Sequence, residues 1–306
     1  MILCKWIWIF LVFCVSHIKT DLWRKVENHP AWKILDAFEC GFSASDRIIG
    51  GLNAALGQFP WIVRLGYHTP GESELDWMCG GALITDKHVV TAAHCVQNGE
   101  DFTLTTIRVG EHNTKTNPDC ELHVCAPPIQ DRSIKAIKSH PKYNKPEFHN
   151  DLALIVLDRP VQLNDYVVPI CLPRGDQLSA PRLGEPLTAA GWGTMNMTTE
   201  ERAKILQYVA VPIVKPELCN LFGGGFKVAS TEICAGAQHN KDACGGDSGG
   251  PLMKVFDTPD GPKNVLVGVV SFGPTICGIR KPGVYTSVPH FLKWILDNVM
   301  NLQVRK

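Results

Sequence analysis

The chain has 306 residues, and 30 lysines and arginines balance 30 aspartates and glutamates, so the formal net charge is zero. Hydrophobic residues make up 45% and charged residues 20%, which excludes an intrinsically disordered chain. The lack of a basic excess argues against nucleic-acid binding. This length allows one large domain or two smaller ones.

The N-terminus carries one apolar run, WIWIFLVFCV, at residues 6–15, which directly follows Lys5. The run is too short to cross a bilayer, which takes roughly 20 residues. A positive start with a short apolar centre is typical of a secretory signal peptide, which we place at residues 1–20. A buried helix and a short signal anchor are the alternatives. No later stretch is long and apolar enough for a membrane span.

The chain has 12 cysteines, which indicates an oxidising compartment. Removal of the signal peptide would take Cys4 and Cys14 with it. The ten that remain are an even number that suits five disulfides. A metal cluster formed by Cys120, His123 and Cys125 is the alternative for one part of the chain. Two cysteines this close in a secreted loop favour a disulfide.

Residues 21–47 are irregular and contain one cysteine, Cys40. Beyond them, short apolar runs separated by turn residues predict strands at 61–65, 81–85, 105–109, 151–157 and 265–272. Strands without intervening helices indicate antiparallel barrels or a sandwich. The last apolar segment, HFLKWILDNVMNLQ at 290–303, has helical spacing and predicts an amphipathic helix that packs on the body.

Three short motifs carry residues suited to nucleophilic catalysis: His94 in TAAHC, Asp151 in NDLALI and Ser248 in CGGDSGGP. Each alone is weak, since it could be an ordinary core histidine, turn aspartate or loop serine. A serine hydroxyl needs an adjacent base, and histidine titrates near neutral pH. A buried carboxylate can hold the imidazole in the required tautomer.

Together and in this order, the three motifs resemble the chymotrypsin-like (trypsin-fold) serine peptidase family over residues 48 to about 300. The resemblance implies an all-β fold of two six-stranded antiparallel β-barrels with a C-terminal α-helix. The peptidase domain would occupy 48–306, with the boundary between barrels near 160–175. Catalysis in this family needs no cofactor.

The resemblance also implies the roles of individual residues. His94, Asp151 and Ser248 would be catalytic, and the amides of Gly246 and Ser248 would form the oxyanion hole. Asp242, six residues before Ser248, would form the floor of the substrate pocket.

The implied pocket walls are Ser271, Gly273 and Gly283, and the two glycines leave room for a long side chain. A carboxylate at the base of a narrow pocket requires a cationic partner, so we expect cleavage after Arg or Lys. A solvated loop position is the alternative for Asp242.

Residues 47–51, RIIGG, resemble the family's activation junction. Residues 21–47 would then be an activation segment or light chain, and cleavage after Arg47 would free the amine of Ile48 to pair with Asp247. The alternative is that this sequence is an ordinary first strand.

Family position implies five disulfides: Cys40–Cys171, Cys79–Cys95, Cys120–Cys125, Cys219–Cys234 and Cys244–Cys277. The first would keep the light chain attached after cleavage. A further disulfide of vertebrate relatives is absent, because Leu187 and Lys254 stand at its positions.

The loop at 110–128 is similar to that of arthropod clip-domain proteases. No clip domain is expected here, because that module needs its own set of cysteines and residues 21–47 contain only Cys40. A haemolymph, venom or digestive enzyme therefore remains open.

The same loop binds calcium in some relatives. The oxygen groups here are the side chains of Glu111, Asn113 and Asp119 and the carbonyl of Thr116. A calcium site and a solvated polar loop are both compatible with the sequence. Asn196 begins a glycosylation sequon, Asn-Met-Thr.

The sequence thus predicts a secreted serine endopeptidase made as a zymogen. Its expected partners are protein substrates, an upstream activating protease and protein inhibitors, without nucleic acid or membrane. A catalytically impaired homologue that binds partners is the first alternative, and a disulfide-rich structural protein is the second. The intact set of three motifs favours the enzyme.

Overall fold

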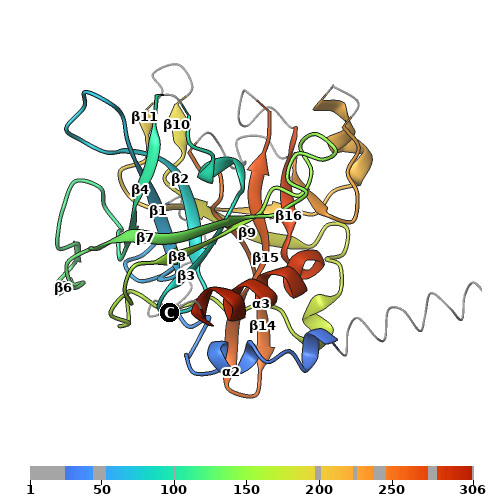
Figure 1. Ribbon diagram of the computed structural model, residues 1–306, viewed down its shortest axis with the longest axis horizontal. Helices are drawn as coiled ribbons and strands as arrows, with labels where there is room; N and C mark the ends of the chain where they lie inside the picture. Colours follow the sequence, from blue (N-terminus) through green and yellow to red (C-terminus); the bar gives the residue numbers. More distant parts are fainter. Residues whose placement is uncertain are drawn as a thin grey trace, which may run out of the picture.

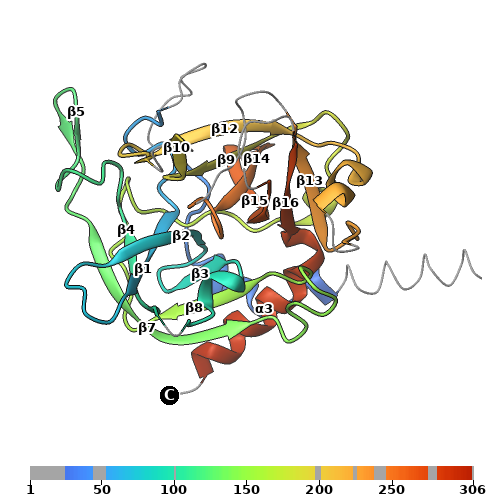
Figure 2. The same cartoon turned by 90° about the horizontal axis from the view of Figure 1, so that it is seen from above.

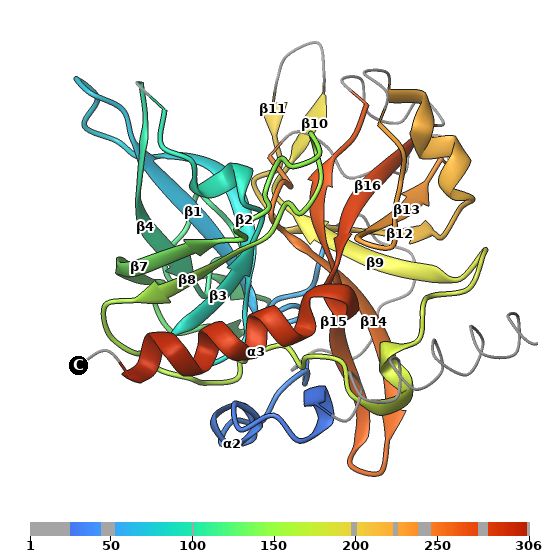
Figure 3. The same cartoon turned by 45° about the vertical axis from the view of Figure 1, so that its right-hand side comes forward.

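The computed structural model describes residues 25–43, 53–99, 101–196, 201–222, 226–237, 246–274 and 281–304. Two β-structures lie side by side, and a helix runs across both (Figures 1 and 3). No helix in these ranges combines the length and hydrophobicity needed to cross a bilayer.

The first β-structure is a closed antiparallel barrel with strand order β1-β2-β3-β8-β7-β4. Its strands β3 and β8 are buried along their whole length. The sequence of β8 is apolar throughout, whereas β3 also buries His88 and Thr91. The strands are β1 (Ile62–His68), β2 (Asp76–Leu83), β3 (His88–Thr91), β4 (Thr103–Val109), β7 (Gln130–Ser139) and β8 (Ala153–Leu157).

The second β-structure is a six-stranded antiparallel sheet with order β12-β9-β14-β15-β16-β13. It differs in one respect from the expected second closed barrel: the ladder is open, and one bridge between Ile213 and Ala235 brings its edges together. The strands are β9 (Pro186–Gly191), β12 (Gln207–Pro212), β13 (Glu232–Gly236), β14 (Pro251–Thr258), β15 (Gly261–Phe272) and β16 (Pro282–Ser287).

Helix α3 (Val288–Val304) confirms the predicted C-terminal helix. Its buried face packs into the main core through Phe291, Leu292, Ile295, Leu296 and Val299. Seen from above, the helix crosses beneath the first barrel and reaches β16 (Figure 2).

Two small hairpins lie outside the β-structures. The first joins β5 (Cys120–Glu121) to β6 (Val124–Cys125), and the second joins β10 (Thr194–Asn196) to β11 (Glu201–Arg202). The five predicted strand segments all fall in or overlap observed strands, so the prediction of strands from short apolar runs between turn residues is confirmed.

The segment 25–43 packs against the back of the domain rather than trailing from it. Its short helix α2 (Trp32–Leu35) lies beneath α3 and beside β14 (Figure 3). Trp32 and Leu35 belong to the main core, and His29 Nε2 lies 3.0 Å from Asp297 of α3. The backbone amide of Gly41 donates to Pro169 at 2.8 Å.

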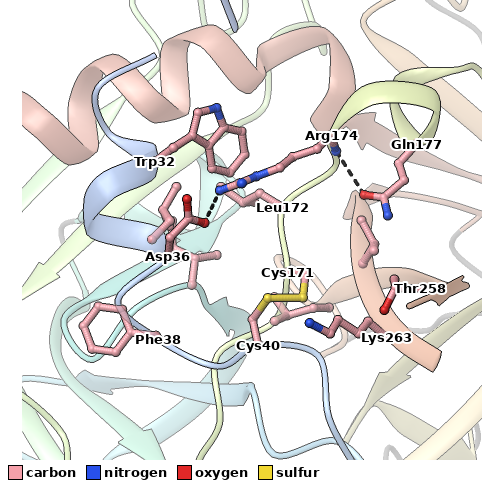
Figure 4. Close-up of a pocket in the computed structure, with 14 residues that line it drawn as sticks. Trp32, Asp36, Phe38, Cys40, Cys171, Leu172, Arg174, Gln177, Thr258 and Lys263 are labelled. Carbon is pink, nitrogen blue, oxygen red and sulfur yellow. Dashed lines mark hydrogen bonds and ion pairs between the residues drawn. A yellow bond between two sulfur atoms is a disulfide. The ribbon is translucent and has the colours of Figure 1, made fainter. Parts of the chain in front are cut away.

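A cavity of about 210 Å³ remains between this segment and the domain (Figure 4). The Cys40–Cys171 disulfide forms part of its wall. Arg174 closes one end, since its guanidinium lies 3.6 Å from the ring centroid of Trp32 and pairs with Asp36. A covalent bond, an ion pair and apolar burial therefore hold the segment to the domain.

Candidate active site

The site lies where the first barrel meets the second sheet. His94 begins a short 3-10 helix, His94–Val96, soon after strand β3 ends. Its backbone amide donates to Asp151 Oδ1 at 2.9 Å, and its Nδ1 lies 2.7 Å from Asp151 Oδ2. One carboxylate therefore fixes both the backbone and the ring of His94.

Asp151 is 5% exposed and receives two further contacts from the second sheet. Ser271 Oγ donates to its Oδ2 at 2.6 Å, and Thr286 Oγ1 donates to its carbonyl at 2.7 Å. Burial raises the pKa of Asp151, but the hydrogen bonds and charge of His94, with the hydroxyl of Ser271, outweigh it and leave the pKa below its ordinary value. The carboxylate is therefore ionised near neutral pH.

This ionisation determines which nitrogen of His94 carries the proton. A carboxylate can only accept hydrogen bonds, so Nδ1 must donate to Asp151 when the ring is neutral. Nε2 is then left with a lone pair that can accept a proton. The arrangement is that of a general base held in one tautomer.

Ser248 lies in a turn between the two β-structures. The amide of Gly80 on β2 donates to the carbonyl of Ser248, and the amide of Gly249 donates to Val270 on β15, both at 2.8 Å. Gly249 has φ +77°, and a Cβ there would lie 2.2 Å from Thr91 Oγ1. The close approach that positions Ser248 therefore requires glycine.

The structure does not join the Ser248 hydroxyl to His94. Within the described residues, His94 Nε2 contacts Cys95 Sγ at 3.5 Å, and no hydrogen bond links His94 to the Ser248 hydroxyl. Nucleophile–base hydrogen bonds are often long without substrate and tighten in the reactive complex. The His94–Asp151 pair is therefore assembled, and Ser248 is held by hydrogen bonds of its own turn to β2 and β15.

The carboxylate of Asp247 packs against two glycines, Gly191 and Gly193, which the sequence motifs did not identify as site residues. The amide of Gly193 donates to Asp247 Oδ1 at 2.8 Å. A Cβ on Gly191 would lie 2.1 Å from the same oxygen, and one on Gly193 would lie 2.3 Å from Oδ2. The sequence Gly-Trp-Gly at 191–193 could have indicated a close backbone contact at these two glycines.

Two of the predicted pocket walls lie close together. A Cβ placed on Gly273 would lie 3.8 Å from the Cα of Gly283, and one placed on Gly283 would lie 3.4 Å from the ring of Tyr285. Ser271, the third predicted wall residue, is buried and contacts Asp151. The predicted pocket floor, Asp242, lies outside the described residues.

An aromatic cluster stands next to these walls. The ring centroids of Phe148 and Phe226 lie 5.5 Å and 5.0 Å from that of Phe272, which follows Ser271 directly. Phe148 is 44% exposed, whereas Phe226 is buried. The cluster therefore gives the site an apolar surface beside Ser271 that solvent can reach.

Among the described residues, four of the five predicted disulfides are present: Cys40–Cys171, Cys79–Cys95, Cys120–Cys125 and Cys219–Cys234. The bond between Cys120 and Cys125 shows that the alternative of a metal cluster with His123 is wrong. Four other predicted residues lie outside the described residues: Arg47, Ile48, Cys244 and Cys277. The side chain of Asn196 lies outside them too.

The predicted calcium-binding residues lie in the loop that precedes the β5–β6 hairpin. Asp119 is 2% exposed, and it accepts hydrogen bonds from the amides of His112 and Asn113 and from the hydroxyl of Thr116. Glu111 is also buried, and its Oε1 has no hydrogen-bond partner.

The charges around Glu111 act in both directions. Burial raises its pKa, and the nearby Asp119 charge adds to this effect. Arg64 and Arg108 oppose it, with nitrogens 3.8 Å and 3.4 Å from Glu111 Oε2. The donor set of hard oxygens and the unpaired Oε1 fit a cation such as calcium.

The comparison with known families decides the membership of this chain. The Trypsin family matches residues 48–295, the part of the chain that contains all three motifs.

The chain belongs to the trypsin family of serine peptidases. As a trypsin-family member it is a serine endopeptidase, and it needs no cofactor for catalysis.

Similar proteins in the trypsin family come from insects. The chain is 39% identical over 271 residues to "CLIP domain-containing serine protease HP8" of Bombyx mori, covering 85% of this chain and 71% of the relative. It is 40% identical to "Phenoloxidase-activating factor 1" of Holotrichia diomphalia, with 85% and 72% covered. The predicted similarity to arthropod clip-domain proteases is thereby confirmed.

A solved structure supports the trypsin-like fold. The Drosophila Grass clip serine protease of the Toll pathway superposes with a TM-score of 0.74 at 33% identity. The match covers 86% of this chain and 75% of Grass.

Proposed function

We propose that this trypsin-family peptidase is secreted as a zymogen, is activated by cleavage after Arg47, and hydrolyses protein substrates after Arg or Lys. The observation that carries the proposal is the His94–Asp151 pair, with its 2.7 Å contact and its ionised carboxylate. An impaired homologue that only binds partners would not need this pair or the glycines that position Ser248.

The proposed reaction has two steps. Ser248 Oγ attacks the carbonyl carbon of the substrate while His94 Nε2 takes the hydroxyl proton. The C–N bond then breaks, and the same proton passes to the leaving amine, which leaves an acyl-Ser248 ester. Water then attacks the ester while His94 Nε2 takes its proton, and the proton passes to Ser248 Oγ as the acid product leaves. Asp151 stabilises the His94 imidazolium formed in each half.

The amides of Gly246 and Ser248 are the proposed oxyanion hole. Gly246 has φ +98°, a conformation that favours glycine. One donor of this kind contributes about 3 kcal/mol to transition-state stabilisation. The hydrogen bond from the amide of Gly193 to Asp247 anchors the residue between Gly246 and Ser248.

Asp242 is the proposed partner of the substrate Arg or Lys. The close approach of Gly273 and Gly283 supports a narrow slot above it. The Phe148–Phe226–Phe272 cluster favours apolar side chains on the acyl side of the substrate, before the basic residue.

The proposed switch uses the amine of Ile48. Released by cleavage, this amine would pair with Asp247 and order the oxyanion loop. Segment 21–47 would stay bound as the light chain, because its disulfide and its packing do not depend on the cleaved bond.

Calcium is proposed as a structural ion held by Glu111, Asn113, Thr116 and Asp119. When bound, it would supply positive charge to the buried carboxylates and take no part in peptide hydrolysis. Secretion, a glycan on Asn196 and a Cys244–Cys277 disulfide complete the proposal.

The names of the relatives suggest the kind of substrate. One relative is named as a factor that activates phenoloxidase. We propose that this chain likewise acts on a protein substrate by limited proteolysis.

The proposal is tested by cleaving the chain after Arg47 and measuring how fast it hydrolyses an arginyl arylamide. We expect activity in the cut chain, at least a 10³-fold loss in Ser248→Ala, and little hydrolysis when alanine replaces the arginine of the substrate. A cut chain as inactive as the Ser248→Ala variant would contradict the proposal.

A further inference from the structure

Arg202 lies directly against the glycine proposed to form the oxyanion hole. A Cβ on Gly246 would lie 3.6 Å from Arg202 Nε and 3.9 Å from its Cδ. Arg202 Nη1 donates to the carbonyl of Trp77 at 2.5 Å, and its backbone pairs with Thr194 in the β10–β11 hairpin. The strand pairing holds the backbone of Arg202, and the Trp77 hydrogen bond holds its guanidinium beside Gly246.

The position of Arg202 relative to Ser248 indicates which half of a substrate it meets. The turn at 248–250 is bonded on one side to Gly80 of β2 and on the other to Val270 of β15. Ser271, a proposed wall of the pocket for the residue before the scissile bond, follows Val270. The acyl half of the substrate therefore lies on the β15 side. Trp77 and Arg202 lie on the β2 side, where the leaving half must pass.

The charge of Arg202 is not compensated by a neighbouring carboxylate. Three arginines surround Trp77, and the other two have acidic partners: Arg64 has Glu111, and Arg108 has Asp131 at 2.8 Å. No carboxylate in the described ranges lies within ion-pair distance of Arg202, which is exposed. Its neighbour Glu201 pairs with Lys204 instead, at 3.6 Å.

We propose that Arg202 binds an acidic side chain among the first three residues after the scissile bond, and so selects substrates with Asp or Glu on the leaving side. This inference rests on the proposed function. A guanidinium offers five donors, of which Trp77 takes one, and the rest suit a carboxylate. Since the pair is partly exposed, we expect a preference of about fivefold.

The test uses matched quenched peptides that share Arg before the scissile bond. Glu or Gln is placed at the first, second or third position after the bond, and kcat/KM is measured for each pair with enzyme cut after Arg47. The wild-type enzyme should favour Glu about fivefold at one position. This ratio should fall toward one in Arg202→Gln and as sodium chloride is raised.

Charge reversal and a matched control sharpen the test. Arg202→Glu should favour Lys over Glu at that position. Lys204→Gln, which removes a nearby exposed cation that pairs with Glu201, should keep the wild-type ratio. Active-site titration normalises each preparation to its competent enzyme.

Two outcomes separate this inference from the proposed function. Cleavage after Arg with a Glu/Gln ratio near one, or a ratio that persists in Arg202→Gln, would overturn the assignment of Arg202 alone. Failure of cut wild-type enzyme to cleave any arginyl peptide would overturn the proposed function and this inference with it.

Discussion

Among the buried polar side chains, His88 on β3 carries a distinct energetic cost. It is 0% exposed, its Nδ1 lies 2.8 Å from Thr85 Oγ1, and its Nε2 has no hydrogen-bond partner. Burial, with a smaller effect of the Lys87 charge, lowers the pKa of His88 from 6.5 to about 4. The folded chain therefore holds this ring neutral where an unfolded chain would protonate it.

This difference predicts a loss of stability in acid. Because the folded pKa is the lower one, the unfolded state binds more protons, and stability falls as pH drops from 6.5 toward 4 and levels off below. Between pH 7 and 4.5 the loss from this group is about 2 kcal/mol. Urea unfolding at both pH values, in a Ser248→Ala background that cannot digest itself, measures it.

His88→Gln should lack this part of the pH dependence. His68→Gln, at an exposed position on the same barrel, should keep it. An equal acid loss in wild type and His88→Gln would contradict the argument.

The motifs predicted His94 and Asp151, and the structure brings these two side chains together. The motifs could not predict that Ser271 and Thr286 contact Asp151, because these residues lie 120 and 135 positions further along the chain. Contacts at such separation depend on how the second sheet meets the barrel. Arg202 was missed for the same reason, because no local pattern places it beside Gly246.

At the scale of elements, the loop between β4 and β5 is organised around Asp119. Hydrogen bonds from the loop end on its carboxylate, and the loop also reaches other elements: Leu206 donates to His112, and Leu56 donates to Glu121 at 2.7 Å. A calcium ion here would stabilise the contact between the barrel and the segment that enters it.

Removal of calcium therefore tests this element. Calcium in hundredfold excess over its Kd would raise the free energy of unfolding by about 2.7 kcal/mol, so a chelator should lower the Tm by about 5 °C. Differential scanning calorimetry of the Ser248→Ala chain, with calcium and with chelator, measures the shift.

Glu111→Gln should abolish the response to calcium, whatever its own Tm. Asp131→Asn, which alters another acidic partner of Arg108, should retain the response. If the chelator leaves the Tm of the Ser248→Ala chain unchanged, calcium has no structural role here.

Apolar runs predicted the strands correctly, and helical spacing predicted the C-terminal helix, but neither pattern could predict how a sheet closes. An apolar run indicates that a strand is buried, and not whether the edges of its sheet meet. The single Ile213–Ala235 bridge at the edge of the second sheet is a tertiary feature of that kind.

Across the whole molecule, the N-terminal segment belongs to the same folded unit as the peptidase domain. The sequence of 21–47 showed only irregularity and one cysteine, because a helix of four residues leaves no periodic signal. In the structure, Trp32 and Leu35 join the main core, and Cys40 is bonded to Cys171 (Figure 4). Such burial lets the segment stay in place whether or not the chain is cut after it.

The central claim is that Ser248 becomes a reactive nucleophile once the chain is cut after Arg47. Mass spectrometry after treatment with a fluorophosphonate tests it directly, because the reagent phosphonylates an activated serine and releases fluoride. We predict a single adduct on Ser248 in the cut chain, slow labelling of the uncut chain, and none in Ser248→Ala. A cut chain that stays unlabelled at Ser248, or an uncut chain labelled equally fast, would contradict the account.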